Sequence, residues 1–260
     1  DSGPIGSAPI AGITYSWSPT NGVADPVASS TTVQLTNPTN EIQTTPYVLT
    51  AIEQGCKNYD TVDVTIFPIP TAEFSIPDGM CFNVNSFDLT ASGYFGPNAS
   101  FQWDFGPVGF PQASTDLQPQ GVIFNVPGDQ DVTLIVTDNT CVSDPFVGTI
   151  EVFEMPVADF SFDISDGCEP LMVAFQDESY NGNSTLYHVW NFGNNTSSTQ
   201  QDPSAVYDQG VYTVTLNVTT SQGCSDQVTQ TDIIEAFEKP KALFEMSDQV
   251  LSIIDPDVTV

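Results

Sequence analysis

The stretch VWNFGNNTSSTQQDPSAVYDQGVYTVTLNV, residues 189–218, decides the fold that we predict for this chain. Trp190 and Phe192 lie two residues apart, so a β-strand would direct both side chains to one face, where a sandwich could bury them. The glycine and two asparagines that begin at Gly193 predict a turn, because Gly and Asn tolerate positive φ. Gly210 and Tyr212 belong to a D-x-G-x-Y corner, in which a tyrosine hydroxyl bonds back to the loop backbone. Bends and buried strands account for this stretch, and nothing in it requires a ligand.

The rest of the chain carries the same β signals. Residues 60–66 and 131–136 alternate polar and apolar side chains, with many β-branched Thr and Val. The 20 prolines and 18 glycines interrupt the chain every few residues, and no useful length of sequence has a helical period. We therefore predict an all-β fold of short antiparallel strands packed as sandwiches.

An eight-residue pattern, F-x-x-P-x-A-x-F, occurs three times, beginning at Phe67, Phe153 and Phe237. Its prolines are 86 and 84 residues apart, and Trp103 lies 87 residues before Trp190. A period of about 85 residues is the size of a whole small sandwich domain rather than of a solenoid repeat. The chain is therefore predicted to be a tandem array.

The repeat divides the chain into four segments. Residues 70–154 and 156–238 are expected to be complete domains, and residues 1–67 an N-terminally incomplete one. Residues 239–260 are expected to begin a further domain. The junctions are short and contain proline, which favours a stiff, extended connection. We therefore expect the sandwiches to form a rod.

Residues 156–238 resemble a PKD domain, an immunoglobulin-like sandwich of large extracellular proteins. The resemblance rests on the W-x-F-G that begins at Trp190 and on the G-x-Y-x-V-x-L that begins at Gly210. In residues 70–154 the pattern recurs at Trp103 and Phe105, whereas Gln130 stands in the tyrosine position and leaves the corner hydrogen bond there open. The resemblance implies tandem immunoglobulin-like (PKD-type) antiparallel β-sandwiches.

Residues 1–67 show a narrower resemblance. Their Y-S-W-S-P, which begins at Tyr15, and the Gly-Cys pair at Cys56 resemble repeats of large surface adhesins of gliding bacteria, which are exported by type IX secretion. That resemblance implies a role in adhesion or as a stalk. The Asp-Thr-Val triplet around Thr61 resembles the O-glycosylation triplet of the same bacteria, so Thr61 is a candidate glycosylation site.

Composition excludes several classes of function. The chain has 33 acidic residues against three Lys+Arg, for a net charge of −30, which disfavours nucleic acids and anionic membrane surfaces as partners. No apolar run reaches the length of a membrane-spanning helix, so no direct membrane insertion is expected. The single histidine, His188, rules out a two-histidine zinc site and is interpreted as a strand residue. We therefore expect no enzyme activity and no required cofactor.

The five cysteines follow the repeat. Cys81 and Cys141 are 60 residues apart, and Cys168 and Cys224 are 56 apart, so one disulfide within each domain is predicted. Cys56 is expected to be unpaired in this stretch. The alternative is a set of buried free thiols. The disulfides would place the protein in an oxidising, extracellular setting.

Acidic residues gather just after the domain junctions, where carboxylate oxygens could bind Ca²⁺. The residues concerned are Glu73, Asp78, Asp159, Asp163, Asp166, Glu245 and Asp248. No EF-hand spacing is present, and the alternative is a solvated acidic surface.

Three functional hypotheses follow. In the first, the chain is an extracellular stalk or spacer of a giant cell-surface adhesin, whose partners are the neighbouring Ig-like repeats. In the second it is a module that binds glycans or other surface proteins, which an exposed row of aromatic side chains would support. In the third it is an accessory region of a secreted hydrolase.

Overall fold

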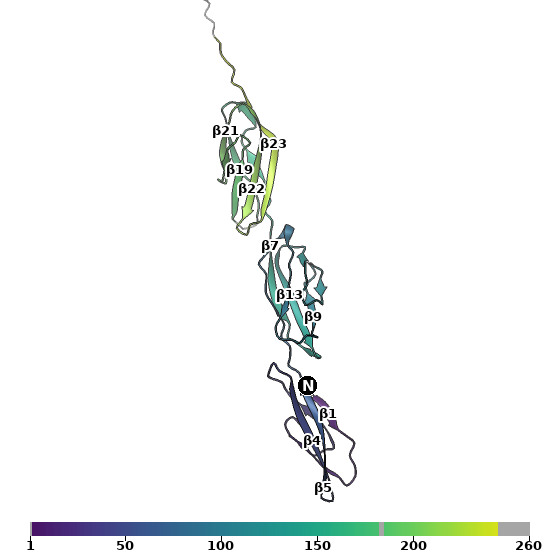
Figure 1. Cartoon of the computed structure of the whole chain (residues 1–260). Helices are drawn as coiled ribbons and strands as arrows, with labels where there is room; N and C mark the ends of the chain where they lie inside the picture. The colour runs from purple at the N-terminus through teal and green to yellow at the C-terminus, as the bar shows by residue number, and fades with distance from the viewer. Residues whose placement is uncertain (1, 182–184, 244–260) are drawn as a thin grey trace, which may run out of the picture. The chain divides into compact units, whose positions relative to one another are not determined.

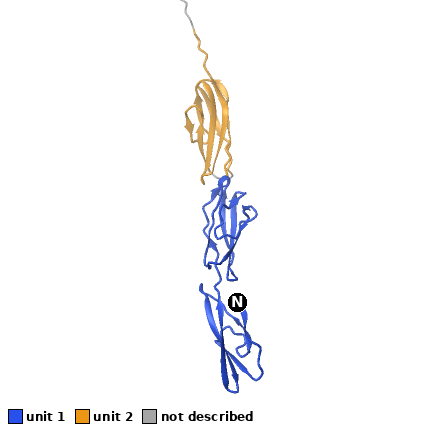
Figure 2. Cartoon of the chain, turned by 45° about the vertical axis from the view of Figure 1, so that its right-hand side comes forward, with its two compact units in different colours: residues 1–154 blue, residues 155–260 orange. Residues whose placement is uncertain are grey.

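The computed structural model describes residues 2–181 and 185–243 (Figure 1). Within these residues the only helical element is a single 3₁₀ turn, η1 (Phe82–Val84), and the other regular structure is β-strand. The predicted all-β fold is confirmed. The chain divides into two compact units, residues 1–154 and 155–260 (Figure 2), and each is described by itself.

The described residues of unit 2 form eight strands arranged in two sheets. They are β16 (Phe160–Phe162), β17 (Asp166–Cys168), β18 (Leu171–Asp177), β19 (Leu186–Asn191), β20 (Ser197–Ser198), β21 (Ser204–Tyr207), β22 (Gly210–Thr220) and β23 (Ser225–Phe237). The larger sheet has the order β17-β23-β22-β19-β20, and the smaller has the order β16-β18-β21. β17 runs parallel to β23, and the other neighbours are antiparallel.

The core of unit 2 lies between these sheets because apolar side chains alternate along the strands. On β18, Leu171, Val173 and Phe175 are buried while the residues between them face solvent. Trp190 enters the same core from β19, and its ring centroid lies 5.6 Å from that of Phe175. Aromatic packing across the two layers thus holds the sandwich together.

The second part of unit 1 repeats this plan. Its strands are β6 (Glu73–Phe74), β7 (Met80–Cys81), β8 (Ala91–Ser92), β9 (Ser100–Asp104), β10 (Gly109–Phe110), β11 (Ala113–Ser114), β12 (Ile123–Phe124), β13 (Gly128–Asp138), β14 (Cys141–Val142) and β15 (Phe146–Phe153). The main sheet has the order β11-β9-β13-β15-β7, with β14 paired to β13, and β7 is again parallel to its neighbour. Trp103, Phe74 and Phe105 lie in its core.

The first part of unit 1 has fewer strands and a smaller core. The strands are β1 (Ser2–Gly6), β2 (Thr14–Ser18), β3 (Ser30–Gln34), β4 (Gln43–Glu53) and β5 (Cys56–Ile66). They form the sheet β2-β4-β5 and the pair β1-β3. The buried residues of the core are Ile5, Trp17, Val33 and Tyr47.

Strand pairing keeps the segments separate. Each of the three hydrophobic cores draws its residues from one of the ranges 5–66, 72–152 and 158–236. Of the further domain predicted at 239–260, residues 244–260 lie outside the described residues, and no strand is present in 239–243.

One internal frame recurs in all three segments. A buried tryptophan pairs with a leucine on the next long strand, in the pairs Trp17–Leu49, Trp103–Leu134 and Trp190–Leu216. Each indole Nε1 also donates a 2.9 Å hydrogen bond to a backbone carbonyl, that of Ala28, Asp116 and Gln200 respectively. This shared register shows that residues 1–67 use the same sandwich frame as the two later segments.

Candidate functional site

The corner before β22 has the hydrogen bond that its pattern predicts. The Tyr212 hydroxyl donates to the carbonyl oxygen of Asp208 at 2.9 Å. Gly193, in the turn after β19, has φ of +75°, and a Cβ there would lie 2.5 Å from the Thr213 carbonyl oxygen. Only glycine fits this close approach of two backbones. These residues of the stretch 189–218 therefore shape the fold.

Residues 70–154 make the same corner with a different side chain. Gln130 is buried, and its Nε2 donates to the carbonyls of Val126 and Gly128, each at 3.2 Å. The amide thus bonds back to the residue four positions before it, as Tyr212 does. The sequence did not predict whether this corner hydrogen bond forms, and the structure shows that the Gln130 amide forms it.

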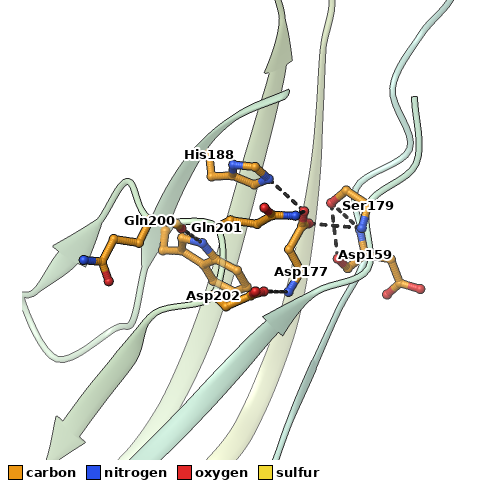
Figure 3. A network of polar contacts seen from close by, with 8 residues as sticks. Asp159, Asp177, Ser179, His188, Gln200, Gln201 and Asp202 are labelled. Atoms are coloured by element: carbon orange, nitrogen blue, oxygen red, sulfur yellow. Dashed lines mark hydrogen bonds and ion pairs between the residues drawn. The ribbon is translucent and has the colours of Figure 1, made fainter. Parts of the chain in front are cut away.

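A network of polar side chains in unit 2 surrounds His188 (Figure 3). His188 Nε2 lies 2.8 Å from Asp177 Oδ2, and the two side chains are 9% and 3% exposed. Because Asp177 ends β18 in the smaller sheet and His188 lies on β19 in the larger one, this contact links the two layers of the sandwich. Its position favours a structural role.

Asp177 is held by several further bonds (Figure 3). Its Oδ1 accepts from the backbone N–H of Ser179 at 3.0 Å, and its Oδ2 accepts from Gln201 Nε2 at 3.3 Å. Its own N–H donates to Asp202 Oδ1 at 2.9 Å. Burial raises the pKa of Asp177, but the hydrogen bonds from Ser179 and His188 and the charge of His188 outweigh it, so the pKa lies below its ordinary value. The carboxylate is therefore ionised at neutral pH.

An Asp–His pair also occurs in catalytic triads, which add a nucleophile within hydrogen-bonding reach of the histidine. In residues 2–181 and 185–243, the hydrogen bond of the His188 ring is to Asp177, and no serine or cysteine side chain bonds to it. Ser179 instead contacts Asp159, donating from Oγ to its carbonyl at 3.2 Å. Sequence reasoning placed His188 in a strand but did not find Asp177, because no local pattern links residues on different sheets.

Comparison with known proteins identifies the fold family. A PKD-domain family model matches residues 154–236, which cover nearly all of the sandwich of unit 2. The PKD1 domain of the Vibrio cholerae metalloprotease PrtV is 35% identical, and the match covers 98% of that domain and 32% of this chain, with a TM-score of 0.28. The chain belongs to the PKD-domain family.

Two other solved structures are similar to parts or most of the chain. The PKD1 domain of Vibrio anguillarum Epp is 32% identical, with 95% of that domain and 32% of this chain covered and a TM-score of 0.28. A titin fragment of three Ig domains is 10% identical over 92% of this chain and 93% of its own length, with a TM-score of 0.47. No curated protein matches the chain.

The predicted disulfides Cys81–Cys141 and Cys168–Cys224 were wrong. Cys141 and Cys168 are free, as is Cys56, whereas Cys81 and Cys224 are disulfide-bonded. The presence of a disulfide, together with a PKD domain, indicates an extracellular protein.

Strand direction explains the error. Cys168 lies opposite Phe237 at the end of β23, whereas Cys224 directly precedes the start of that strand. The 13 residues of β23 therefore separate the two cysteines by roughly 40 Å. A disulfide needs Cα atoms within about 7 Å, so this pair cannot close. In residues 70–154, Cys81 and Cys141 are likewise separated along β15.

The other predicted sites remain predictions. Thr61 is exposed on β5, an edge strand of its sheet, where a sugar could be attached. The described residues contain no group of three or more acidic, histidine or cysteine side chains placed to hold a metal. Asp163 Oδ1 instead accepts the N–H of Ala174 at 2.9 Å, and Asp159 Oδ1 accepts that of Phe160. Glu245 and Asp248 lie outside the described residues.

The three tryptophans cannot contribute to an exposed aromatic row of the kind that glycan binding would use. Trp17, Trp103 and Trp190 are at most 4% exposed. Among the residues described, no helix is long and apolar enough to cross a membrane.

Proposed function

We propose that this chain is a non-catalytic stalk or spacer segment of a giant secreted cell-surface adhesin, which projects a binding tip from the cell. The observation that carries the proposal is the tryptophan frame that recurs in three successive segments. In each segment the largest aromatic side chain is used for the core, as expected of a module whose task is to fold and be repeated.

The state of the single histidine supports the absence of catalysis. His188 is bonded to Asp177 and 9% exposed, which leaves it poorly placed to exchange protons with a substrate. The net charge of −30 supports partners other than nucleic acid or an anionic membrane. The proposed partners are the neighbouring Ig-like repeats and, beyond them, surface proteins or glycans.

The narrower assignment, to adhesins of gliding bacteria exported by type IX secretion, rests on residues 1–67. The Y-S-W-S-P and Gly-Cys features that carry the resemblance occupy β2 and the turn into β5. Trp17 in the first of them is the core tryptophan of this segment, so the resemblance reaches the recurrent frame.

A replacement experiment tests the spacer role. In the parent polypeptide, residues 1–260 would be deleted, or replaced by three unrelated Ig domains. We expect deletion to weaken adhesion of cells to their surface, and replacement to restore it, because a spacer contributes length and stiffness rather than a specific surface. If the replacement does not restore adhesion, although the protein is exported in equal amount, the spacer role is contradicted and a glycan- or protein-binding module is favoured.

A second candidate is an accessory region of a secreted hydrolase. It is favoured by the match to the PKD1 domain of the V. cholerae metalloprotease PrtV. The same deletion decides it: loss of secreted proteolytic activity, with adhesion unchanged, would support this role and contradict the adhesin.

A further inference from the structure

Three rows of side chains on the outward side of the larger sheet of unit 2 are uncharged. His188 and Trp190 of β19 point into the core, so the alternate residues of that strand point to solvent. β19, β22 and β23 lie side by side (Figure 1), and the residues paired with these alternate positions point the same way. The rows, which together form the outer face, are Tyr187, Thr219 and Ser225; Val189, Asn217 and Gln227; and Asn191, Thr215 and Thr229.

Most of the outer face consists of hydroxyl and amide groups. Thr215 Oγ1 and Thr229 Oγ1 lie 3.0 Å apart, and Asn217 lies directly opposite Gln227. Such groups both donate and accept hydrogen bonds. The Tyr187 side chain is 61% exposed and adds an aromatic ring. A tyrosine ring beside neutral hydrogen-bonding groups matches the chemistry of a sugar, which has an apolar C–H face and hydroxyls at its edge.

The absence of charge sets the outer face apart from the rest of this acidic protein. The chain has a net charge of −30, and residues 156–238 contain no lysine or arginine. An anionic ligand would therefore be repelled by the surrounding carboxylates. The centres of binding surfaces are depleted of charged residues and enriched in tyrosine. This composition favours an uncharged ligand.

The size of the outer face limits what it can bind. From Tyr187 to Asn191 it extends roughly 13 Å along β19, and the outermost of its three strands are about 10 Å apart. Its area is on the order of 200 Å², whereas a stable protein interface buries roughly 800 Å² on each partner. The outer face is therefore too small to hold a second copy of the chain and is suited to a short oligosaccharide.

The sandwich of residues 70–154 lacks this combination at the equivalent positions. In the shared tryptophan register, Ser100 takes the place of Tyr187, and Asp104 takes the place of Asn191. Both the exposed ring and the neutral charge are therefore missing there. The outer face is a property of one sandwich and not of the common frame.

We propose that the outer face binds a neutral oligosaccharide, with the Tyr187 ring stacked on a sugar and the amides of Asn217 and Gln227 hydrogen-bonded to its hydroxyls. The inference deepens the proposed function and rests on it, because it assigns the glycan partner to one face of one sandwich. A face of this size binds a sugar weakly, so adhesion would still depend on the binding tip. The replacement experiment above therefore tests the spacer role separately.

Binding of the purified 260-residue chain to an oligosaccharide array tests the proposal. The array would contain neutral oligosaccharides of glucose, mannose, galactose and N-acetylglucosamine, with sulfated and sialylated oligosaccharides as anionic counterparts. We expect binding to a neutral oligosaccharide and weaker binding to the anionic ones. Equal or stronger binding to the anionic oligosaccharides, or binding to none, would overturn the proposal without affecting the spacer role.

Variants of the same chain locate the site. Tyr187→Ala should weaken binding of the neutral oligosaccharide about tenfold, whereas Tyr187→Phe keeps the ring and should retain most of the affinity. Asn217→Ala should cause a second, independent loss. Tyr180→Ala is the matched control, because Tyr180 is 67% exposed in the same unit but lies outside the outer face. Circular dichroism would verify that each variant is folded, and equal binding by Tyr187→Ala and Tyr180→Ala would overturn the proposal.

Discussion

The sandwiches of residues 70–154 and 156–238 share one arrangement of strands but differ at one pair of equivalent positions, which is polar in the second sandwich and apolar in the first. Asp177 pairs with Phe160, and Ala91 occupies the same register opposite Phe74. His188 precedes the core tryptophan by two residues, as Phe101 does in the other sandwich. One sandwich therefore has a buried Asp–His contact where the other has alanine and phenylalanine within its apolar cluster.

The sandwich frame therefore accommodates either a polar or an apolar pair at these positions, provided that both residues change together. Replacing a buried charged pair by apolar residues is often neutral, whereas removing one partner leaves the other without compensation. The corner tolerates a change of one side chain, because Gln130 and Tyr212 differ in size but both donate a hydrogen bond to a backbone carbonyl of the preceding loop.

The largest effect should come from the feature that the two sandwiches share. Trp103→Ala and Trp190→Ala should each lower the free energy of unfolding of their own sandwich by about 3–5 kcal/mol, because both rings are buried and leave a cavity. Urea unfolding, followed by the far-ultraviolet circular dichroism of the β-sheets, measures both losses. Trp→Phe variants, which keep an aromatic ring, are the controls. A small loss for Trp103→Ala alone would show that the two frames are not energetically equivalent.

The Asp–His contact should give the next largest effect. Asp177→Ala should destabilise unit 2 by about 2–3 kcal/mol, because the buried His188 ring loses its hydrogen-bond partner. The double variant Asp177→Ala/His188→Phe reproduces the residues of the other sandwich and should recover most of that loss. A double-mutant cycle in urea measures the coupling. If the double variant is less stable than Asp177→Ala, the two sites are not interchangeable.

The two corners should respond alike. Tyr212→Phe and Gln130→Leu each remove a corner hydrogen bond and should cost about 1 kcal/mol in their own sandwich. Tyr187→Phe is a matched control, because that tyrosine is 61% exposed and its hydroxyl is not part of the corner. Thermal unfolding distinguishes them, and a loss at Tyr187 equal to that at Tyr212 would remove the special role of the corner.

The smallest effect concerns pH. The pKa of Asp177 is lowered below its ordinary 3.8, so the ionised carboxylate stabilises the folded state above pH 3.8, and this contribution is lost as pH falls through the lower folded value. Unit 2 should therefore lose stability in acid more steeply than its Asp177→Asn variant. Residues 70–154 have Ala91 at this position and should show no such component. Urea midpoints over the acid range test this, and identical profiles for native and variant protein would contradict it.

Much of the fold could be predicted from the sequence because strand alternation, turn residues and core aromatics are local signals. The period of the repeat located Trp103 and Trp190 in equivalent places, and the corner pattern identified Tyr212. The same repeat interval also predicted that Cys81 corresponds to Cys168 and Cys141 to Cys224, and the structure places Cys81 and Cys168 at equivalent strand ends. The sequence therefore predicted which cysteines are equivalent in the two sandwiches, but it did not predict which cysteines lie close together within one sandwich.

A tandem array of acidic β-sandwiches could be predicted from the sequence alone, since strand alternation involves neighbouring residues and the repeat recurs at nearly equal intervals. Which side chains come into contact depends on how the strands run and how the sheets pack. Asp177 reaches His188 because two sheets pack face to face, and Cys168 is kept from Cys224 because a long strand runs between them. Strand direction and sheet packing set those distances, and neither is encoded in the spacing of residues along the chain.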